Sequence, residues 1–382
     1  MSFAFFVNES NIWTLSTQNP FVFAIFYHFP RKYSMLFINY FHLLCLVLFG
    51  FGGFPFTHYI GILDEEDRRV FKRKNRNDIK EITRVLEPYQ EEIEGIVVES
   101  TFNWYWIVDG LMEAGYRVHL ANTAAMQQYE GLKYIDDTRD SFWLAHMLRL
   151  EILPEGYIYP KEKRAVRDLL RKRMMLVQQR TAHILSMQTM VNRNKGVPIS
   201  SDTIKKMSDE EVEGLFSDEH LVMSAQCDHK VIGVLSEQID KTEKAVLKEV
   251  KLKKPYKKLL TVPGIGEILA MTIMLETGDI GRFREVGKYS SYCRCVSAKK
   301  VSNGKNKGKG NRKNGNKYLA WAYVEAAHFH VRYCEEARKW HQRKASKSNA
   351  ILATKALSNK LARACYYIIK EQVHYDKKRM FG

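Results

Sequence analysis

Leu-Leu-Thr-Val-Pro-Gly-Ile-Gly, at residues 259–266, opens the stretch that decides how the C-terminal part of this chain folds. Its Pro-Gly turn stands between two apolar segments, which is typical of two helices joined by a tight turn. The stretch ends in a tract from Ser297 to Lys317 that holds eight Lys or Arg residues and no acid. Lysines neutralise phosphates and glycines let a backbone approach them closely, so this tract predicts contact with a polyanion.

One hydroxyl, that of Ser302, lies near the start of the basic tract. A serine that attacks a DNA phosphodiester needs such surroundings, because negative charge builds up on the phosphate during the reaction. Ser290, Ser291 and Ser297 compete for this role, and most loop serines are simply solvated. No neighbouring His or Asp identifies a general base for Ser302.

The same region supplies the candidates for DNA binding. Val262–Gly266 is similar to the turn of helix-hairpin-helix modules, whose backbone N–H groups hold DNA phosphates without reading bases. A plain interhelical turn is the alternative, and composition alone would make residues 303–317 a disordered loop. The DNA-binding candidates are Gly264, Gly266, Lys299, Lys300, Lys305, Lys307, Lys309, Arg312, Lys313 and Lys317.

The whole chain has 382 residues, a formal net charge of +17 and a pI near 9.4. This length allows two or three domains, and the charge favours a nucleic-acid partner over a small neutral metabolite. Six cysteines form no Cys-x-x-Cys pair, which predicts free thiols in a reducing cytoplasm.

The first 56 residues differ in composition from the rest. They hold 13 of the 20 phenylalanines, and Met35–Phe56 is uncharged and about as long as a membrane span. Three interpretations stay open: a membrane anchor, a buried apolar extension, or a non-native leader from a mis-start or frameshift. The unpatterned, Phe-rich composition favours the leader, and a membrane partner is not expected.

Residues 57–155 predict an α/β domain, because short apolar strands alternate with helices. The expected strands are Tyr59–Leu63, Arg69–Lys74, Glu94–Glu99 and Tyr116–Ala121. The expected helices begin near Ile79, Trp104 and Thr138.

Three acidic residues of this domain could share a divalent metal. Glu99 closes an apolar strand, and Asp137 and Asp140 are three residues apart at a helix start, so their carboxylates can lie on one face. Oxygen ligands of this kind suit Mg²⁺ or Mn²⁺. The alternative is that the two Asp residues only cap a helix.

Residues 156–255 predict two long helices with heptad-like apolar spacing around a polar link. An antiparallel hairpin, an intersubunit coiled coil and an ordinary helical bundle all fit this pattern. Residues 256–382 predict a mainly helical domain, with helices over Tyr318–Arg332 and Ala350–Gln372.

These segments together resemble the insertion-sequence one-ten family of bacterial transposases, also called DEDD transposases, over roughly residues 58–375. The likeness is strongest in Glu94–Trp106, Leu132–Leu148 and Leu259–Tyr333. It implies a RuvC-like domain of RNase H fold over 57–155, a helical coiled-coil connector over 156–255, and a transposase domain over 256–382.

The resemblance also implies a function. Members recombine DNA with four acidic residues that hold Mg²⁺ and with a serine that forms a covalent link to DNA, and some use a structured guide RNA. By motif, Glu99, Asp137 and Asp140 match the second, third and fourth acids, and Ser302 matches the serine. We also expect a homo-oligomer, a dimer or a tetramer, in the cytoplasm.

The chain departs from the family pattern at the first acid. That Asp belongs on an opening strand shortly before Tyr59–Leu63, yet no Asp precedes Asp64, which lies in the following turn. We therefore expect the first strand of the domain to be missing and recombination to be impaired. The rival functions are a catalytically inactive DNA- or RNA-binding remnant, a metal-dependent hydrolase of branched DNA, and a membrane-anchored protein.

Overall fold

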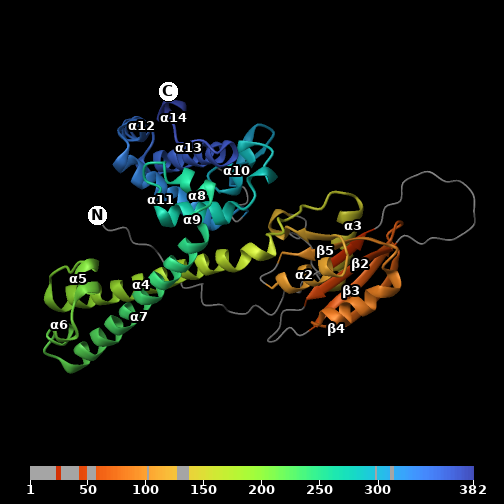
Figure 1. The fold of residues 1–382 in the computed structure, drawn as a ribbon, viewed down its shortest axis with the longest axis horizontal. Coiled ribbons are helices and arrows are strands. Elements are labelled where there is room, and N and C mark those ends of the chain that lie inside the picture. The colour runs from red at the N-terminus through yellow and green to blue at the C-terminus, as the bar shows by residue number, and fades with distance from the viewer. Residues whose placement is uncertain are drawn as a thin grey trace, which may run out of the picture. The chain divides into compact units, whose positions relative to one another are not determined.

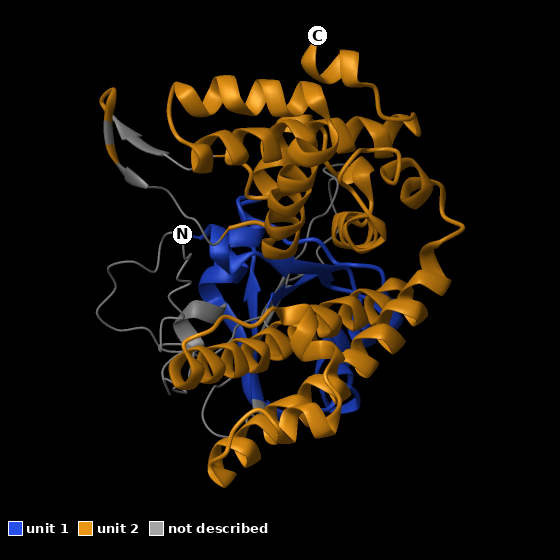
Figure 2. Ribbon diagram, turned by 90° about the vertical axis from the view of Figure 1, so that its left-hand side faces the viewer, with its two compact units in different colours: residues 1–161 blue, residues 162–382 orange. Residues whose placement is uncertain are grey.

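A computed structural model describes residues 57–100, 103–126, 137–296, 299–309 and 314–382, with two earlier strands at residues 23–26 and 43–49. Both of those strands, and a few other positions that include residues 137–141 and 299–302, are described by their backbone alone. The chain forms two compact units, residues 1–161 and 162–382, which Figure 2 colours separately.

The first unit is built on a six-stranded sheet in which β5 is a central strand. The strand order is β1-β5-β2-β3-β4, with β6 also paired to β5 (Figure 1). Strands β2, β3 and β4 form an antiparallel meander, while β2, β5 and β6 run parallel. The strands are β1 (Phe23–Phe26), β2 (Leu43–Phe49), β3 (Thr57–Asp64), β4 (Arg69–Arg76), β5 (Ile93–Glu99) and β6 (Val118–Ala121).

Helices pack on this sheet and close its core. Their apolar residues, such as Ile82, Ile107 and Ala145, share one buried cluster with Ile62 and Ile96 of the strands. The helices are α1 (Ile79–Leu86), α2 (Tyr105–Glu113) and α3 (Asp137–Arg149), and short 3₁₀ turns cover Glu87–Tyr89 and Thr123–Ala125.

The second unit begins with two long helices, α4 (Lys161–Lys195) and α7 (Glu219–Val250). Arg173 pairs with Glu243 and, further along α4, His183 pairs with Asp228, so the two helices run antiparallel. Their far end is closed by α5 (Ser201–Lys206) and α6 (Asp209–Glu213), which pack on α4 and α7 through a separate apolar cluster.

The rest of the second unit is a helical domain with one small β-hairpin. Its centre holds three buried tyrosines, and the hydroxyls of Tyr289 and Tyr323 lie 2.7 Å apart. The elements are α8 (Lys254–Leu259), α9 (Glu267–Thr277), a 3₁₀ turn (Ile280–Arg282), α10 (Val286–Tyr292), β7 (Lys299–Ser302), β8 (Lys305–Lys309), α11 (Lys317–Tyr333), α12 (Glu335–Ser346), α13 (Ala350–Glu371) and α14 (Lys377–Phe381).

The predicted strands and helices of residues 57–155 are confirmed to within two residues at each end, and so are the two C-terminal helices. The antiparallel hairpin at residues 161–250 lies within one chain. Two predictions need correction. Residues 305–309 form a strand, whereas composition suggested a disordered loop over residues 303–317. The domain was expected to lack its first strand, yet β2, from within the Phe-rich stretch, joins the sheet beside β3.

The apolar segment Met35–Phe56 lies largely outside the described residues, apart from β2. Among the helices that the structure describes, none is long and apolar enough to cross a membrane.

Five of the six cysteines have described side chains, and all five are free thiols, as predicted. Cys227 is exposed, whereas the other four are buried. Burial raises the pKa of Cys295 to about 11 and that of Cys365 to about 12, so both thiols stay protonated at neutral pH.

The turn between α8 and α9 packs directly on α11. Gly264 has φ +88°, and a Cβ atom there would stand 2.5 Å from the backbone nitrogen of His330. The imidazole of His330 binds the carbonyl oxygen of Pro263 at 2.6 Å. Gly266, in contrast, has open space where a Cβ would stand and an ordinary φ of −83°.

The Gly264→Ala substitution should therefore destabilise the second unit by about 2–5 kcal/mol, from backbone strain and overpacking together. Gly266→Ala is the matched control and should change stability by less than about 1 kcal/mol. Urea unfolding followed by the fluorescence of Trp321 and Trp340 would measure both. Equal losses in the two variants would contradict this account of the turn.

His58 gives the first unit a pH-dependent stability. The side chain is fully buried, and its Nδ1 lies 3.0 Å from the Oδ1 of Asn77. Burial lowers the pKa of His58 from 6.5 to about 4, although the bond to Asn77 acts in the opposite direction.

Because the folded protein disfavours the charged imidazole, stability is complete above pH 6.5 and decreases as the pH falls through 6.5 toward 4. The loss should reach about 3 kcal/mol at the acidic end. His58→Gln should flatten this dependence, which hydrogen exchange of the β3 and β5 amides at pH 4–7.5 would detect. An unchanged pH profile in the variant would show that another group is responsible.

Candidate functional site

Glu99 lies where the sheet can present a catalytic group. It is the last residue of β5, it is half-buried, and it pairs with Ala121 of the parallel strand β6. Leu46 of β2 pairs with Val97, so the same parallel register brings Leu48 beside Glu99. The carboxyl ends of β2, β5 and β6 therefore share one edge of the sheet, as expected for functional groups in α/β proteins.

Asp64 lies at the opposite edge of the sheet. It ends β3 and pairs with Leu43, which in turn lies beside Ile93 at the start of β5. Ile93 and Glu99 are six residue steps apart along β5, or roughly 20 Å of strand. The buried carboxylate of Asp64 accepts hydrogen bonds from the backbone N–H groups of Glu66 and Arg68 and from the Arg68 guanidinium. Asp64 thus stabilises a turn and lies at the edge of the sheet opposite Glu99.

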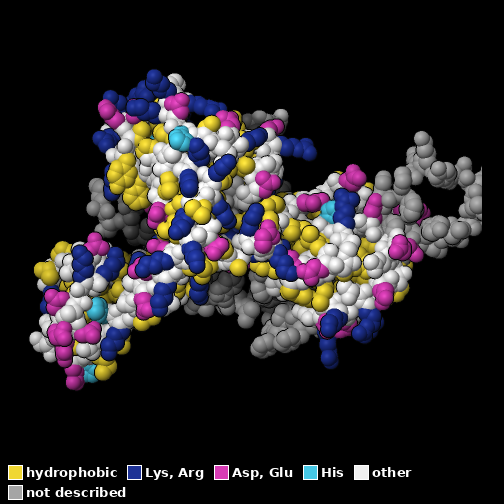
Figure 3. All heavy atoms as spheres, viewed as in Figure 1, with side chains coloured by type: hydrophobic (Ala, Val, Ile, Leu, Met, Phe, Trp, Pro, Cys, Tyr) yellow, Lys and Arg dark blue, Asp and Glu magenta, His cyan; other side chains and the backbone are white. Residues whose placement is uncertain are grey.

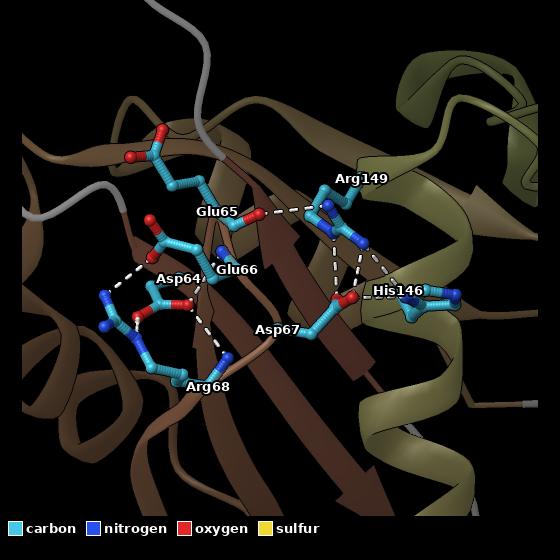
Figure 4. Close-up of polar contacts among 7 residues, drawn as sticks. All are labelled: Asp64, Glu65, Glu66, Asp67, Arg68, His146 and Arg149. Carbon is cyan, nitrogen blue, oxygen red and sulfur yellow. Dashed lines mark hydrogen bonds and ion pairs between the residues drawn. The ribbon is translucent and has the colours of Figure 1, made fainter.

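A polar cluster fixes the last turn of α3 to the turn between β3 and β4 (Figure 4). The carboxylate of Asp67 binds Nδ1 of His146 and Nε of Arg149, each at 2.9 Å. Arg149 also donates to the carbonyl oxygen of Glu65 at 3.0 Å. Asp67 itself adopts a left-handed backbone, with φ 64°, which turns its carboxylate toward α3.

This anchor has a consequence for the two acids at the start of α3. Asp140 precedes Arg149 by nine residues, so it lies roughly 13 Å back along the helix axis. Asp137 and Asp140 therefore occupy the end of α3 that points away from Asp67, whereas the anchored end stays at the edge of Asp64. The structure describes only the backbone at these two positions.

Among the residues whose side chains are described, no group of three or more His, Cys, Asp or Glu residues could hold a metal ion. The cluster of Glu99, Asp137 and Asp140 lies partly outside that set. Carboxylates are nevertheless the ligands that Mg²⁺ prefers. Strand β2, which pairs with β5, carries no acid and reads Leu-Leu-Cys-Leu-Val-Leu-Phe.

Ser302 ends β7 at the tip of the β7–β8 hairpin. Asn303 and Gly304 form the turn with φ values of 49° and 70°, and Ser302 pairs with Lys305 across it. Positive φ at both turn residues is the signature of a type I′ turn, for which Asn-Gly is the preferred sequence. The backbone of Ser302 is thus held beside a lysine in a tight hairpin, although its side chain lies outside the described set.

The other predicted DNA-binding residues are distributed around this hairpin. The side chains of Lys305, Lys307 and Lys317 are exposed, and Lys317 begins α11. Of the two glycines, Gly266 is exposed, whereas Gly264 packs against α11. Lys299 and Lys300 belong to β7 and Lys309 to β8, while Arg312 and Lys313 lie outside the described residues.

The base of the hairpin is clamped on the helical domain. Arg294 donates to the carbonyl oxygen of Gly315 at 2.9 Å, and the N–H of Asn316 donates to that of Tyr292 at 2.6 Å. Gly315 has φ +92°, and a Cβ there would stand 2.5 Å from the Tyr292 oxygen. Only glycine at residue 315 therefore allows the segment before α11 to approach the end of α10 so closely.

A buried polar network joins this base to the long helix α4. Arg171 holds the carboxylate of Glu276 through two hydrogen bonds of 2.6 and 2.7 Å. The side-chain amide of Asn316 donates to the same carboxylate at 2.7 Å, and its oxygen caps α11 by accepting from the N–H groups of Tyr318 and Leu319. Burial lowers the pKa of Arg171, but the bond to Glu276 outweighs this and raises it above its usual value.

Sequence reasoning missed this network. Asn316 carried a usable signal, since Asn before a helix is a preferred N-cap residue. Arg171 and Glu276 carried none, because 105 residues separate them in the chain.

Two family models match parts of this chain. The model of the Transposase IS116/IS110/IS902 family matches residues 256–342, and the DEDD model of IS110 elements, described as a transposase, matches residues 56–194. The DEDD match indicates an RNase H-like fold for the sheet domain.

A transposase for insertion sequence element IS1328 of Yersinia enterocolitica is 25% identical to this chain over 153 residues. The match covers 39% of this chain and 46% of that relative, so the chain spans about half the length of the curated relative it matches. From the two family models and this relative, we conclude that the chain belongs to the IS110 family of insertion-sequence transposases.

Proposed function

We propose that this protein is a DNA transposase that cuts and rejoins DNA through Ser302, with Glu99, Asp137 and Asp140 as a Mg²⁺-binding cluster. The observation that carries the proposal is the hairpin itself. It presents Ser302 beside Lys305 at the tip of a tight turn, on a base clamped by Arg294 and Asn316. A serine in an unstructured loop would lack this support.

The proposed reaction has two balanced steps. The hydroxyl oxygen of Ser302 attacks a DNA phosphorus, and the P–O bond to one DNA oxygen breaks. The serine proton passes through solvent to that oxygen, which leaves as a hydroxyl. A hydroxyl of the receiving strand then attacks the phosphoserine, which restores Ser302. Lys305 and Lys307 are exposed close to the tip and can hold the phosphate oxygens as charge develops.

The acidic residues would act on the same phosphodiester. A bound Mg²⁺ or Mn²⁺ ion would polarise the phosphate and stabilise the leaving oxygen. Glu99, at the carboxyl edge of the sheet, and the two acids in the first turn of α3 would hold it through oxygen atoms.

The family membership supports several further proposals. DNA is the expected partner, together with a structured guide RNA. The α4–α7 hairpin would form the coiled-coil connector through which the protein assembles as a dimer or a tetramer. The RNase H-like domain would then supply the carboxylates to a serine of the same or another protomer.

A second candidate function is a catalytically inactive DNA- or RNA-binding remnant. The sequence of β2 favours it, because the strand beside Glu99 carries no acid and Leu48 occupies the position next to that carboxylate. Loss of one ligand weakens a metal site built from four.

Trapping of a covalent protein–DNA adduct tests the leading proposal. The wild-type protein should form an adduct with element-end DNA in Mg²⁺ or Mn²⁺, and Ser302→Ala should abolish it, because the attacking oxygen is lost. Ser297→Ala is the matched control from the same tract and should retain the adduct. An adduct that survives Ser302→Ala would refute this role of the serine, and no adduct in the wild type would favour the remnant.

Leu48→Asp tests the missing acid. In the parallel register of β2 with β5, a carboxylate at residue 48 lies beside Glu99 and completes the cluster. Strand transfer should then rise by at least roughly tenfold, because loss of a residue that supports a metal site usually lowers activity by that factor or more. Leu46→Asp, two residues earlier on the same strand face, is the control and should give no gain. Equal activity in both variants would contradict the register argument.

A further inference from the structure

Strand β4 carries an unusual concentration of positive charge. It reads Arg-Val-Phe-Lys-Arg-Lys-Asn-Arg and contains no acid. It is an edge strand, paired only with β3 in the sheet path, and its five basic side chains are exposed. Figure 3 shows Lys and Arg side chains gathered over this strand. Charges on an edge strand can serve merely to prevent pairing with other chains, which is the competing explanation.

The pairing of β4 with β3 decides which side chains share a face. Residues directly opposite in an antiparallel pair point to the same side, and neighbours along a strand alternate. Lys74 lies opposite Tyr59 and Lys72 opposite Gly61, whereas Arg73 lies opposite Ile60 and so belongs to the other face. Lys72 and Lys74 therefore project from one face, with Tyr59 beside them.

Tyr59 organises this pair of lysines. Its half-buried ring lies 5.8 Å from the ammonium of Lys72 and 5.5 Å from that of Lys74. Both distances fall within the range of a cation–π attraction. Two ammonium groups are thus held over one aromatic ring rather than left as independent, mobile charges.

The same face carries Glu99. Tyr59 pairs with Leu48 of β2, and the parallel register of β2 with β5 places Leu48 beside Glu99. A single row across the sheet therefore runs from Glu99 through Leu48 and Tyr59 to Lys74. Three strand spacings separate its ends, or about 14 Å.

We propose that Lys72, Lys74 and Tyr59 bind the phosphodiester backbone of the nucleic-acid strand that is processed at Glu99. This inference rests on the proposed function and adds to it a docking surface on the first unit, separate in sequence from the basic tract at residues 299–317 of the second unit. Lysines bind phosphates as point charges, and an aromatic ring accepts a sugar or base without reading its identity. The arrangement predicts binding that depends on salt and not on sequence.

Fluorescence anisotropy with the full-length protein tests the proposal. The probes are single-stranded DNA, duplex DNA and RNA of one sequence, titrated at several salt concentrations in EDTA so that no chemistry occurs. Lys72→Ala and Lys74→Ala should each lower the slope of log affinity against log salt by about 0.7 on single strands or about 0.9 on duplex. Arg73→Ala, from the same strand but the opposite face, is the matched control and should leave the slope unchanged.

The probes distinguish the sources of the phosphodiester, because the nucleic acid that docks here is the one whose slope changes. Equal effects of Lys72→Ala, Lys74→Ala and Arg73→Ala would overturn the proposal, and so would aggregation of the lysine variants with unaltered affinity, which would support edge protection. Displacement of the probe by an acidic peptide at equal charge concentration would also overturn it. If the wild-type protein bound no nucleic acid at all, the proposed function itself would fail.

Discussion

The buried carboxylate of Glu276 is the constraint on which the second unit depends. It is 3% exposed, so its charge must be compensated inside the protein. Arg171 does this from α4, and Asn316 does so from the start of α11. Removal of one partner from such a buried pair typically costs about 3–5 kcal/mol, because the other charge is left uncompensated. One side chain of α9 therefore joins a long helix, a helix start and the base of the hairpin that carries Ser302.

In the first unit, too, a carboxylate joins elements that are distant in the chain, but through more exposed side chains. Asp67 joins the β3–β4 turn to the end of α3 through Arg149 and His146. These side chains are about a quarter to a third exposed, so each contact contributes less than a buried pair would. The cluster acts mainly through geometry, because it determines which end of α3 faces the edge of Asp64. In the first unit, the Asp67–Arg149 pair holds one end of α3, and the proposed metal ligands lie at its other end. In the second unit, the Arg171–Glu276 pair supports the base of the β7–β8 hairpin, and Ser302 lies at its tip.

Much of the fold could be predicted from the sequence, because its signals are local. The continuous apolar run in Glu94–Glu99 and the spacing of Ile79, Ile82 and Leu86 identify their elements correctly. Composition misled where local geometry dominates. The tract after Ser302 looks disordered by composition, yet Asn303-Gly304 is the strongest short hairpin signal that a sequence offers. The placement of β2 could not be predicted, since register depends on partners distant in the chain.

The candidate site was predictable in its residue types but not in its supports. Glu99 lies at a strand end, as its context suggested, whereas the hairpin that carries Ser302 was not predicted. Gly264 shows the limit of a motif, since its positive φ allows close packing on α11 and leaves Gly266 as the exposed glycine of the pair. Whether the carboxylates and the serine meet at one phosphate depends on distances that no spacing in the sequence encodes.

The long hairpin gives the Arg171–Glu276 contact a mechanical meaning. Helix α4 continues for 24 residues beyond Arg171 to Lys195, or roughly 36 Å of axis. A tilt of α4 by about 10° about that ion pair would displace its distal end, at Lys195, by about 6 Å. A force applied at that tip would therefore act on the Arg171–Glu276 contact and, through Asn316, on the base of the β7–β8 hairpin.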